Sequence, residues 1–212
     1  MNLIPLQFIE PAELQQISQY SREDLQNIDI DLMAMSKSQL INFSFSIFSE
    51  FQCEEVDYDI LKVFVQVIAA NYADNKFHNL SHAVCVQQFA YVLLTKVSSV
   101  QFTPFDSTTL LICALCHDVG HPGVSNKFLN SVFNKLGILY GFQSTLERMH
   151  IATTLLIMSN PQYDFLKFGN EKKLEYFQKI TEIILVTDLA NAHKLADEIR
   201  HVPLSNITVF PF

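Results

Sequence analysis

Histidines concentrate in the middle of this 212-residue chain. Most of them lie between positions 78 and 150: His78, His82, His117, His121 and His150. His78 and His82 are four residues apart, a spacing that places both side chains on one face of a helix. His117 and Asp118 follow the apolar run 110–116, and an ionisable pair at the end of a buried run costs free energy unless something binds it. This pattern predicts a metal site.

The residue types indicate what such a site would do. Imidazole and carboxylate ligands together suit Zn, Mn, Fe or Mg. The two oxygens of Asp118 can bridge two metal ions, which would hold a shared hydroxide and clamp a phosphoryl group. Imidazoles farther away can orient the water molecules on the metals. The cluster therefore favours metal-assisted hydrolysis of a phosphoester.

A second motif favours another class of protein. Cys113-Ala-Leu-Cys116-His117 matches the C-x-x-C-H pattern of covalent haem attachment. Haem attachment normally needs export, and the first basic residue is only Arg22, so the N-terminus has no secretory pattern. We therefore interpret the cysteines as small core residues, and a visible absorption spectrum separates the two hypotheses.

The elements that must position these residues are predicted to be helices. The chain is 49% hydrophobic and 17% charged, which permits a large core and excludes global disorder. Ser36 is expected to cap one helix, and Asp57 or Asp59 the next, because apolar residues then recur at helical spacing. Further helices are predicted over 79–97, 107–117, 125–136, 145–159 and 171–199. We predict an all-α fold.

Charge and hydropathy exclude several partners. The net charge is −8, and all of this excess falls within residues 1–77. An acidic chain with no basic block is a poor candidate for binding nucleic acid. No apolar run approaches the length of a membrane span. We expect a cytoplasmic protein with no membrane span.

Four segments resemble the class I 3′,5′-cyclic nucleotide phosphodiesterases, an HD-superfamily group. Residues 77–83, Phe-His-Asn-Leu-Ser-His-Ala, resemble that family's (Tyr/Phe)-His-Asn-x-x-His-Ala segment. Residues 117–126 match its H-D-x-x-H-x-G-x-x-N signature at every fixed position. Residues 146–150 and 186–189 resemble its Leu-Glu-Asn-His-His and Ala-Thr-Asp-Met/Leu segments. The segments stand in the family's order, so the resemblance implies the family's all-α catalytic fold.

The resemblance also implies the reaction and the principal residues. His78 corresponds to the general acid that protonates the departing O3′. His82, His117 and Asp118 correspond to metal ligands, with Asp118 bridging two divalent ions, Zn together with Mg or Mn. The implied substrate is a cyclic nucleotide, cAMP or cGMP, and the product is a nucleoside 5′-monophosphate formed when a bridging hydroxide attacks phosphorus.

Further matching residues would support this chemistry. His121, Glu147 and Thr187 correspond to groups that hold metal-bound water, and His150 is assigned a supporting role. Arg148-Met149 departs from the family's Asn-His, and His193 does not align with its later histidine. The family's remaining aspartate ligand, purine-binding glutamine and aromatic clamp have no counterpart here, and Asp188 is not expected to replace the aspartate.

These differences predict a partial catalytic domain. We expect it over residues 36–200, lacking the family's C-terminal helices, after an N-terminal extension of weak pattern over 1–35 and before an irregular apolar tail over 201–212. Its turnover is expected to be weak, and homo-oligomerisation or another association through exposed apolar surface is expected. Two alternatives remain open: a non-catalytic truncated family member that binds a partner, and another HD-type phosphohydrolase.

Overall fold

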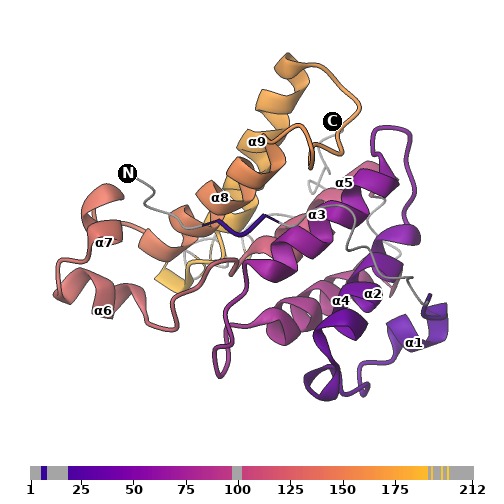
Figure 1. The fold of residues 1–212 in the computed structure, drawn as a ribbon, viewed down its shortest axis with the longest axis horizontal. Coiled ribbons are helices and arrows are strands. Elements are labelled where there is room, and N and C mark those ends of the chain that lie inside the picture. Colours follow the sequence, from indigo (N-terminus) through magenta and orange to yellow (C-terminus); the bar gives the residue numbers. More distant parts are fainter. Residues whose placement is uncertain are drawn as a thin grey trace.

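The computed structural model describes residues 6–8, 19–96, 102–190, 192, 197 and 200, and these parts are helical (Figure 1). Among the described residues, the β-structure is limited to an isolated antiparallel bridge between Val56 and Leu166. The prediction of an all-α fold is therefore confirmed. The elements in chain order are α1 (Arg22–Gln26), the 3-10 helix η2 (Leu32–Ala34), α2 (Lys37–Ser49), α3 (Tyr58–Ala70), α4 (Leu80–Lys96), α5 (Pro104–Cys116), α6 (Asn126–Ser131), α7 (Lys135–Leu139), α8 (Thr145–Met158) and α9 (Asn170–Leu185).

The main core is rich in aromatic side chains. Helix α4 packs against α5 and α2, while α9 packs against α8 and α5. The largest fully buried side chains include Phe43, Phe48, Phe64, Tyr91 and Phe165. Fully burying one such side chain stabilises a fold by about 1.5–3 kcal/mol. These buried rings thus help to hold together the helices that carry the histidines.

The described part of the N-terminal extension packs on this core. Leu25 of α1 and Leu32 of η2 are buried in the same cluster as the core helices. The side-chain amide of Gln88 on α4 donates hydrogen bonds to the carbonyls of Leu25 and Asn27. Residues 22–34 therefore cover one side of α4.

Local capping signals set several helix starts. The Ser36 hydroxyl accepts a hydrogen bond from the amide of Gln39, and the Asp57 carboxylate caps α3, as predicted. Helix α5 begins at Pro104, three residues before the predicted start, with Thr103 as its cap. Proline suits the first helical position, because the amide that it lacks has no partner there.

Two predicted helices are each divided by a break. The one expected over 125–136 divides into α6 and α7, because Phe133 adopts a φ of 50° and Asn134 caps a new helix. The one expected over 171–199 is interrupted, because α9 ends at Leu185 and residues 186–188 form a turn. The described residues 189, 190, 192 and 197 are helical again. The broken positions contain neither glycine nor proline, and their signals are the weaker ones of Asn134 and Asp188, whose side chains accept backbone amides at the start of the next helical residues.

The cysteines, the possible membrane spans and the apolar tail were also interpreted from the sequence. Cys113 and Cys116 are buried in the main core, which agrees with a packing role. No described helix is long and apolar enough to cross a membrane. The apolar tail 201–212 lies outside the described residues, and a cytoplasmic location stays a prediction.

Candidate metal centre and active site

A cavity of about 570 Å³ lies where the start of α4, the end of α5, helix α8 and the turn after α9 meet. Its lining includes Phe77, Gly123, Asn126, Lys127 and Leu189. It also includes every predicted site residue: His78, His82, His117, Asp118, His121, Glu147, His150 and Thr187. Residues far apart in the sequence thus converge on one cavity.

Helix α4 delivers His82 from its first turn. The side-chain carbonyl of Asn79 accepts a hydrogen bond from the backbone amide of His82 at 3.0 Å. The Asn79 amide group in turn donates to the carbonyl of Asn75. Asn79 therefore satisfies an otherwise free amide at the helix start, and this fixes the position of His82 at the cavity.

The end of α5 presents His117 and Asp118 to His82. The Nδ1 atom of His117 lies 2.8 Å from the Ala114 carbonyl and donates to it, so Nε2 faces Asp118 Oδ2 at 3.2 Å. His82 Nε2 lies 3.4 Å from the same oxygen. One ligand atom from each of the three residues lies within 4.8 Å of the others. An imidazole oriented by a backbone carbonyl is typical of metal ligands, so these residues fit a divalent ion.

His150 lies closer to Asp118 than a supporting role suggests. Its Nδ1 donates to the Val119 carbonyl at 2.7 Å, and its Nε2 lies 3.6 Å from Asp118 Oδ1. His150, Asp118 and His121 form a second group with ligand atoms within 4.8 Å of one another. Asp118 thus joins both groups, one at each carboxylate oxygen. In the sequence, His150 was indicated by the resemblance of residues 146–150 to the Leu-Glu-Asn-His-His segment.

His121 and His78 form a stacked pair at the cavity wall. Their ring centroids are 3.9 Å apart and nearly parallel. The Nδ1 atom of His121 accepts the backbone amide of Gly123, so a neutral His121 carries its proton on Nε2. This tautomer makes His121 a hydrogen-bond donor at Nε2, which suits the positioning of water or substrate oxygen.

Asn75 ties the two histidine segments together, and sequence reasoning missed it. Its side-chain amide donates to the carbonyl of His78 at 3.0 Å and to the carbonyl of His121 at 2.8 Å. A Cβ atom at Gly123, where φ is 76°, would lie 2.9 Å from the Asn75 side-chain oxygen. The glycine of the signature segment therefore leaves room for this bridge.

The far wall of the cavity carries Glu147, Thr187 and Asp188. Asn126 donates a hydrogen bond to Glu147 Oε2 at 2.9 Å, which orients that carboxyl group. The Thr187 hydroxyl donates to the carbonyl of Ile184. Asp188 accepts a hydrogen bond from Ser144 at 2.7 Å, and it belongs to neither group of candidate metal ligands among the described residues.

Burial and hydrogen bonding set the protonation states. Burial alone would raise the pKa of Asp118, but hydrogen bonds from His117 and His82 hold it well below its usual range. Burial, with the nearby charge of His78, lowers the pKa of His121 to about 4. Burial likewise lowers the pKa of His150 to about 4, and it raises the pKa of Glu147. Burial alone would lower the pKa of His117, but its hydrogen bond to Asp118 raises it. A charged Asp118 beside the neutral ring of His150 is the state in which these groups bind metal, and His117 must give up its Nε2 proton to do so.

Comparisons with known proteins agree with this geometry. Residues 77–206 match the family profile described as 3′5′-cyclic nucleotide phosphodiesterase. This chain belongs to that family. It is 29% identical over 187 residues to the 3′,5′-cyclic-nucleotide phosphodiesterase regA of Dictyostelium discoideum, a match that covers 85% of this chain and 24% of the relative. It is 28% identical over 162 residues to the 3′,5′-cyclic-AMP phosphodiesterase 4C of Mus musculus, with 74% of this chain and 24% of the relative covered.

A solved phosphodiesterase domain has the same fold. The crystal structure of the phosphodiesterase domain of the RhoPDE fusion protein from the choanoflagellate Salpingoeca rosetta superposes with a TM-score of 0.78 at 29% identity. The match covers 84% of this chain and 57% of that chain. This phosphodiesterase chain therefore spans about a quarter of the two curated relatives named above and just over half of the solved domain.

Proposed function

We propose that this chain binds two divalent metal ions around Asp118 and hydrolyses a 3′,5′-cyclic nucleotide to the nucleoside 5′-monophosphate. The single observation that carries the proposal is the placement of imidazole nitrogens at both oxygens of one carboxylate, at 3.2–3.6 Å. Family membership supports the same substrate class.

The ligand sets follow from the two groups around Asp118. His82, His117 and Asp118 would hold one ion, and Asp118 with His150 of the second group would hold the other. His121 also belongs to the second group, but its Nδ1 already accepts the amide of Gly123. Bound cations would offset the charge of the phosphodiester and lower the pKa of a coordinated water. Burial of His150 keeps its ring neutral near pH 7, so its Nε2 lone pair is available.

The surrounding residues would position the substrate and move the proton. His78 lines the cavity and lies against His121, so a protonated His78 can donate to the leaving O3′. His121 offers its Nε2–H to an oxygen in the cavity, and Glu147, held by Asn126, offers an acceptor. Lys127 at the cavity lining supplies a positive charge for the anionic substrate.

Metal analysis combined with hydrolysis assays tests the proposal. The purified chain is assayed for bound metal and for turnover of cAMP, cGMP and a phosphomonoester. Asp118→Asn removes a charge from both ligand sets and should lose metal and turnover. Asp188→Asn is the matched control, because this carboxylate lines the same cavity but is bonded to Ser144, and it should keep its metal.

The outcomes separate the alternatives. Metal-dependent hydrolysis of a cyclic nucleotide that Asp118→Asn loses supports the proposal. Turnover of the phosphomonoester alone would indicate another HD-type phosphohydrolase. Metal binding without turnover of any substrate would indicate the non-catalytic alternative, and equal metal content in both asparagine variants would overturn the ligand assignment.

A further inference from the structure

The segment from α6 to α7, residues 126–142, exposes an unusual amount of apolar surface. We call it the α6–α7 hairpin, and it projects at one end of the longest axis of the molecule (Figure 1). Six of its large apolar side chains are 41–72% exposed: Phe128, Val132, Phe133, Ile138, Leu139 and Phe142. Several large apolar side chains that gather in so short a segment indicate an interaction surface.

These exposed side chains lie outside the hairpin's own small core. The hairpin has a separate small core of Leu129, Leu146 and Met149, with Val124, Leu136 and Tyr140 packed around it. Backbone hydrogen bonds from Phe142 to Gly137 and from Asn134 to Leu129 close the segment. The hairpin is thus a defined structure that carries a second, outward-facing apolar set.

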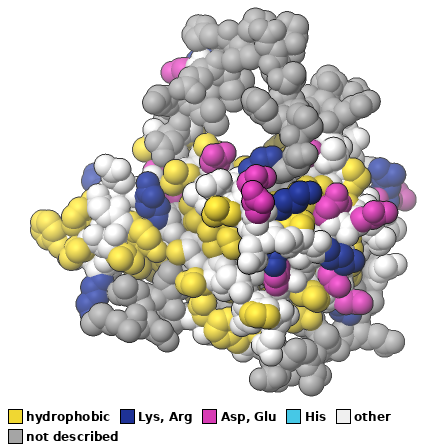
Figure 2. Space-filling model, turned by 90° about the horizontal axis from the view of Figure 1, so that it is seen from above, with side chains coloured by type: hydrophobic (Ala, Val, Ile, Leu, Met, Phe, Trp, Pro, Cys, Tyr) yellow, Lys and Arg dark blue, Asp and Glu magenta, His cyan; other side chains and the backbone are white. Residues whose placement is uncertain are grey.

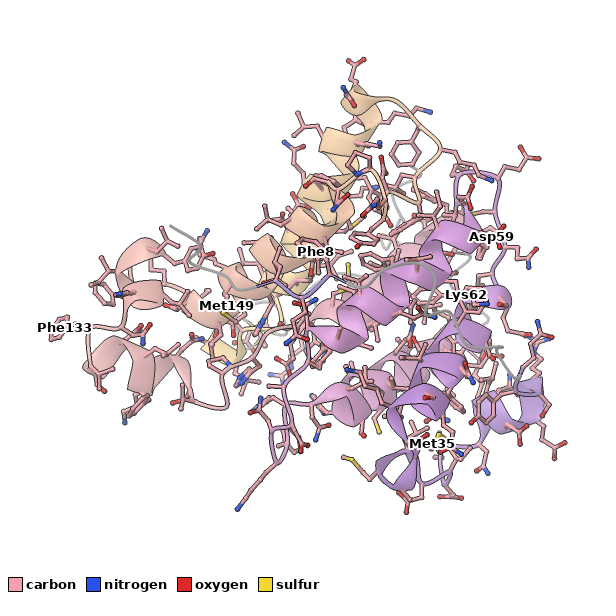
Figure 3. The ribbon with its side chains drawn as sticks, in the orientation of Figure 1. Phe8, Met35, Asp59, Lys62, Phe133 and Met149 are labelled. Carbon is pink, nitrogen blue, oxygen red and sulfur yellow. The ribbon has the colours of Figure 1, made fainter. Side chains whose placement is uncertain are left out.

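The backbone is strained where it presents two of these side chains. Phe133 and Phe142 have φ angles of 50° and 59°, a region that bulky residues rarely adopt. Their rings meet edge to face with centroids 6.1 Å apart. Phe133 is 72% exposed, and Figure 3 shows it at the extremity of the hairpin. Strain that holds an apolar ring out in solvent suggests a function for that ring.

The charge of this region is opposite to that of the whole chain. The chain has a net charge of −8, yet residues 119–146 contain no aspartate or glutamate and include Lys127 and Lys135. Hydrophobic side chains gather at this end of the molecule, with basic side chains beside them (Figure 2). Apolar and basic residues together match a surface that is anionic outside and apolar beneath.

We propose that the α6–α7 hairpin docks on an anionic lipid surface, with Phe133 and Ile138 entering the headgroup region. A projecting apolar tip can enter the soft interface of a bilayer. In a symmetric dimer the hairpin of one copy would face the hairpin of the other. Lys127 and Lys135 of both copies would then lie close together, and their like charges would repel. Residues with apolar and basic side chains are the ones that hold interfacial segments at a membrane.

Docking would also place the metal cavity near the lipid surface. Asn126 and Lys127, at the start of the hairpin, line that cavity. The proposal does not depend on the hydrolytic activity, since it concerns a different surface and its test measures lipid binding alone.

Vesicle sedimentation tests the proposal with matched variants. The chain is mixed with vesicles of phosphatidylcholine and phosphatidylserine, or of phosphatidylcholine alone. Phe133→Asn should keep the fold, because asparagine tolerates positive φ, and it should weaken binding to the anionic vesicles about tenfold. Lys135→Gln should weaken binding about fivefold. Ile28→Asn is the control, because Ile28 is 67% exposed beside acidic residues, and it should bind like the unchanged chain.

The absence of tryptophan permits a second readout. The chain contains no Trp, so Phe133→Trp introduces a single fluorescent reporter at the hairpin tip. Its emission should shift to the blue and become protected from an aqueous quencher when anionic vesicles are added. Ile28→Trp should show neither change.

Three results would overturn the proposal. One is no binding to the anionic vesicles, and another is equal binding by Phe133→Asn, Ile28→Asn and the unchanged chain. The third is self-association in the absence of lipid, measured by sedimentation velocity, that Phe133→Asn abolishes. That result would make the hairpin a contact between two copies of the chain. Thermal unfolding of each variant shows that the comparison is made between folded proteins.

Discussion

Asp118 is the residue on which the candidate site depends. His117 and His82 face one of its oxygens and His150 faces the other, and each imidazole comes from a different part of the fold. Backbone carbonyls accept the Nδ1–H of His117 and of His150, so both rings are fixed before any ion arrives. Because these rings are already held in place, less conformational entropy is lost when a metal ion binds.

At the scale of single residues, we predict that the His117→Ala and His78→Ala variants differ in metal content. His117→Ala removes a ligand and should weaken metal binding by at least about tenfold, whereas His78→Ala should keep its metal because His78 belongs to neither ligand group. Both variants should lose hydrolysis, one for lack of an ion and the other for lack of an acid. The metal content of both variants is measured after exhaustive dialysis. An equal loss of metal in both variants would indicate that His78 is a metal ligand.

A second prediction concerns the glycine of the signature segment. Gly123→Ala would place a methyl group 2.9 Å from the Asn75 side-chain oxygen, at a φ of 76°. Gly141→Ala is the control, since its φ is 63° but no atom lies within 4 Å. Gly141→Ala should lower the free energy of unfolding by about 1–2 kcal/mol, because it introduces backbone strain alone. Gly123→Ala should lower it further, because it also disturbs the hydrogen bonds from Asn75 to His78 and His121. Urea unfolding measures both, and equal losses would show that the Asn75 contact is unimportant.

At the scale of elements, the N-terminus of α5 should be sensitive to a single substitution. The Thr103 hydroxyl lies 2.6 Å from the Asp106 carboxylate in a capping box, and Asp106 is buried. Thr103→Ala should lower the free energy of unfolding by about 1–2 kcal/mol, because it removes the cap and leaves a buried carboxylate with fewer partners.

The control for that substitution is Ser21→Ala on α1. Ser21 and Asp24 form the same capping box with the same 2.6 Å contact, but both are exposed. Ser21→Ala should therefore cost less than Thr103→Ala when unfolding is followed by circular dichroism. A larger loss for Ser21→Ala would contradict the role assigned to the burial of Asp106.

The elements also show how far sequence reasoning reaches. The starts of α2 and α3 were predicted from Ser36 and Asp57, because capping is decided within a few residues. The division between α6 and α7 was missed, because the positive φ of Phe133 depends on the packing of the whole hairpin. Tertiary context overrides local propensity at such positions.

The same contrast holds within the site. His82, His117 and Asp118 stand in short motifs whose spacing indicates their chemistry. Asn75 could not be assigned, because its two acceptors, on His78 and His121, come together only in the folded chain. The position of His150 at Asp118 depends in the same way on the packing of α8 against α5.

For the whole molecule, an apolar cavity adjoins the metal site. It has a volume of about 510 Å³, is lined by α4, α5 and the end of α9, and shares His117 and Thr187 with the metal cavity. Large apolar residues nearby are exposed, including Leu93 and Leu189. Association through exposed apolar surface stays a prediction, and sedimentation velocity over a range of concentrations measures it.

The last prediction is that metal ions stabilise the whole fold. The ligands come from α4, from the end of α5 and from α8, so unfolding separates them and ions bind mainly to the folded chain. At a free metal concentration 100 times the dissociation constant, one site adds about 2.7 kcal/mol to the free energy of unfolding. For a chain of this size each kcal/mol raises Tm by about 2–4 °C.

A chelator should therefore lower Tm by several degrees, and added Zn²⁺ or Mn²⁺ should restore it. Asp118→Asn should show no metal-dependent shift, while Asp188→Asn should behave like the unchanged chain. A full shift in Asp118→Asn would mean that the stabilising ion binds elsewhere.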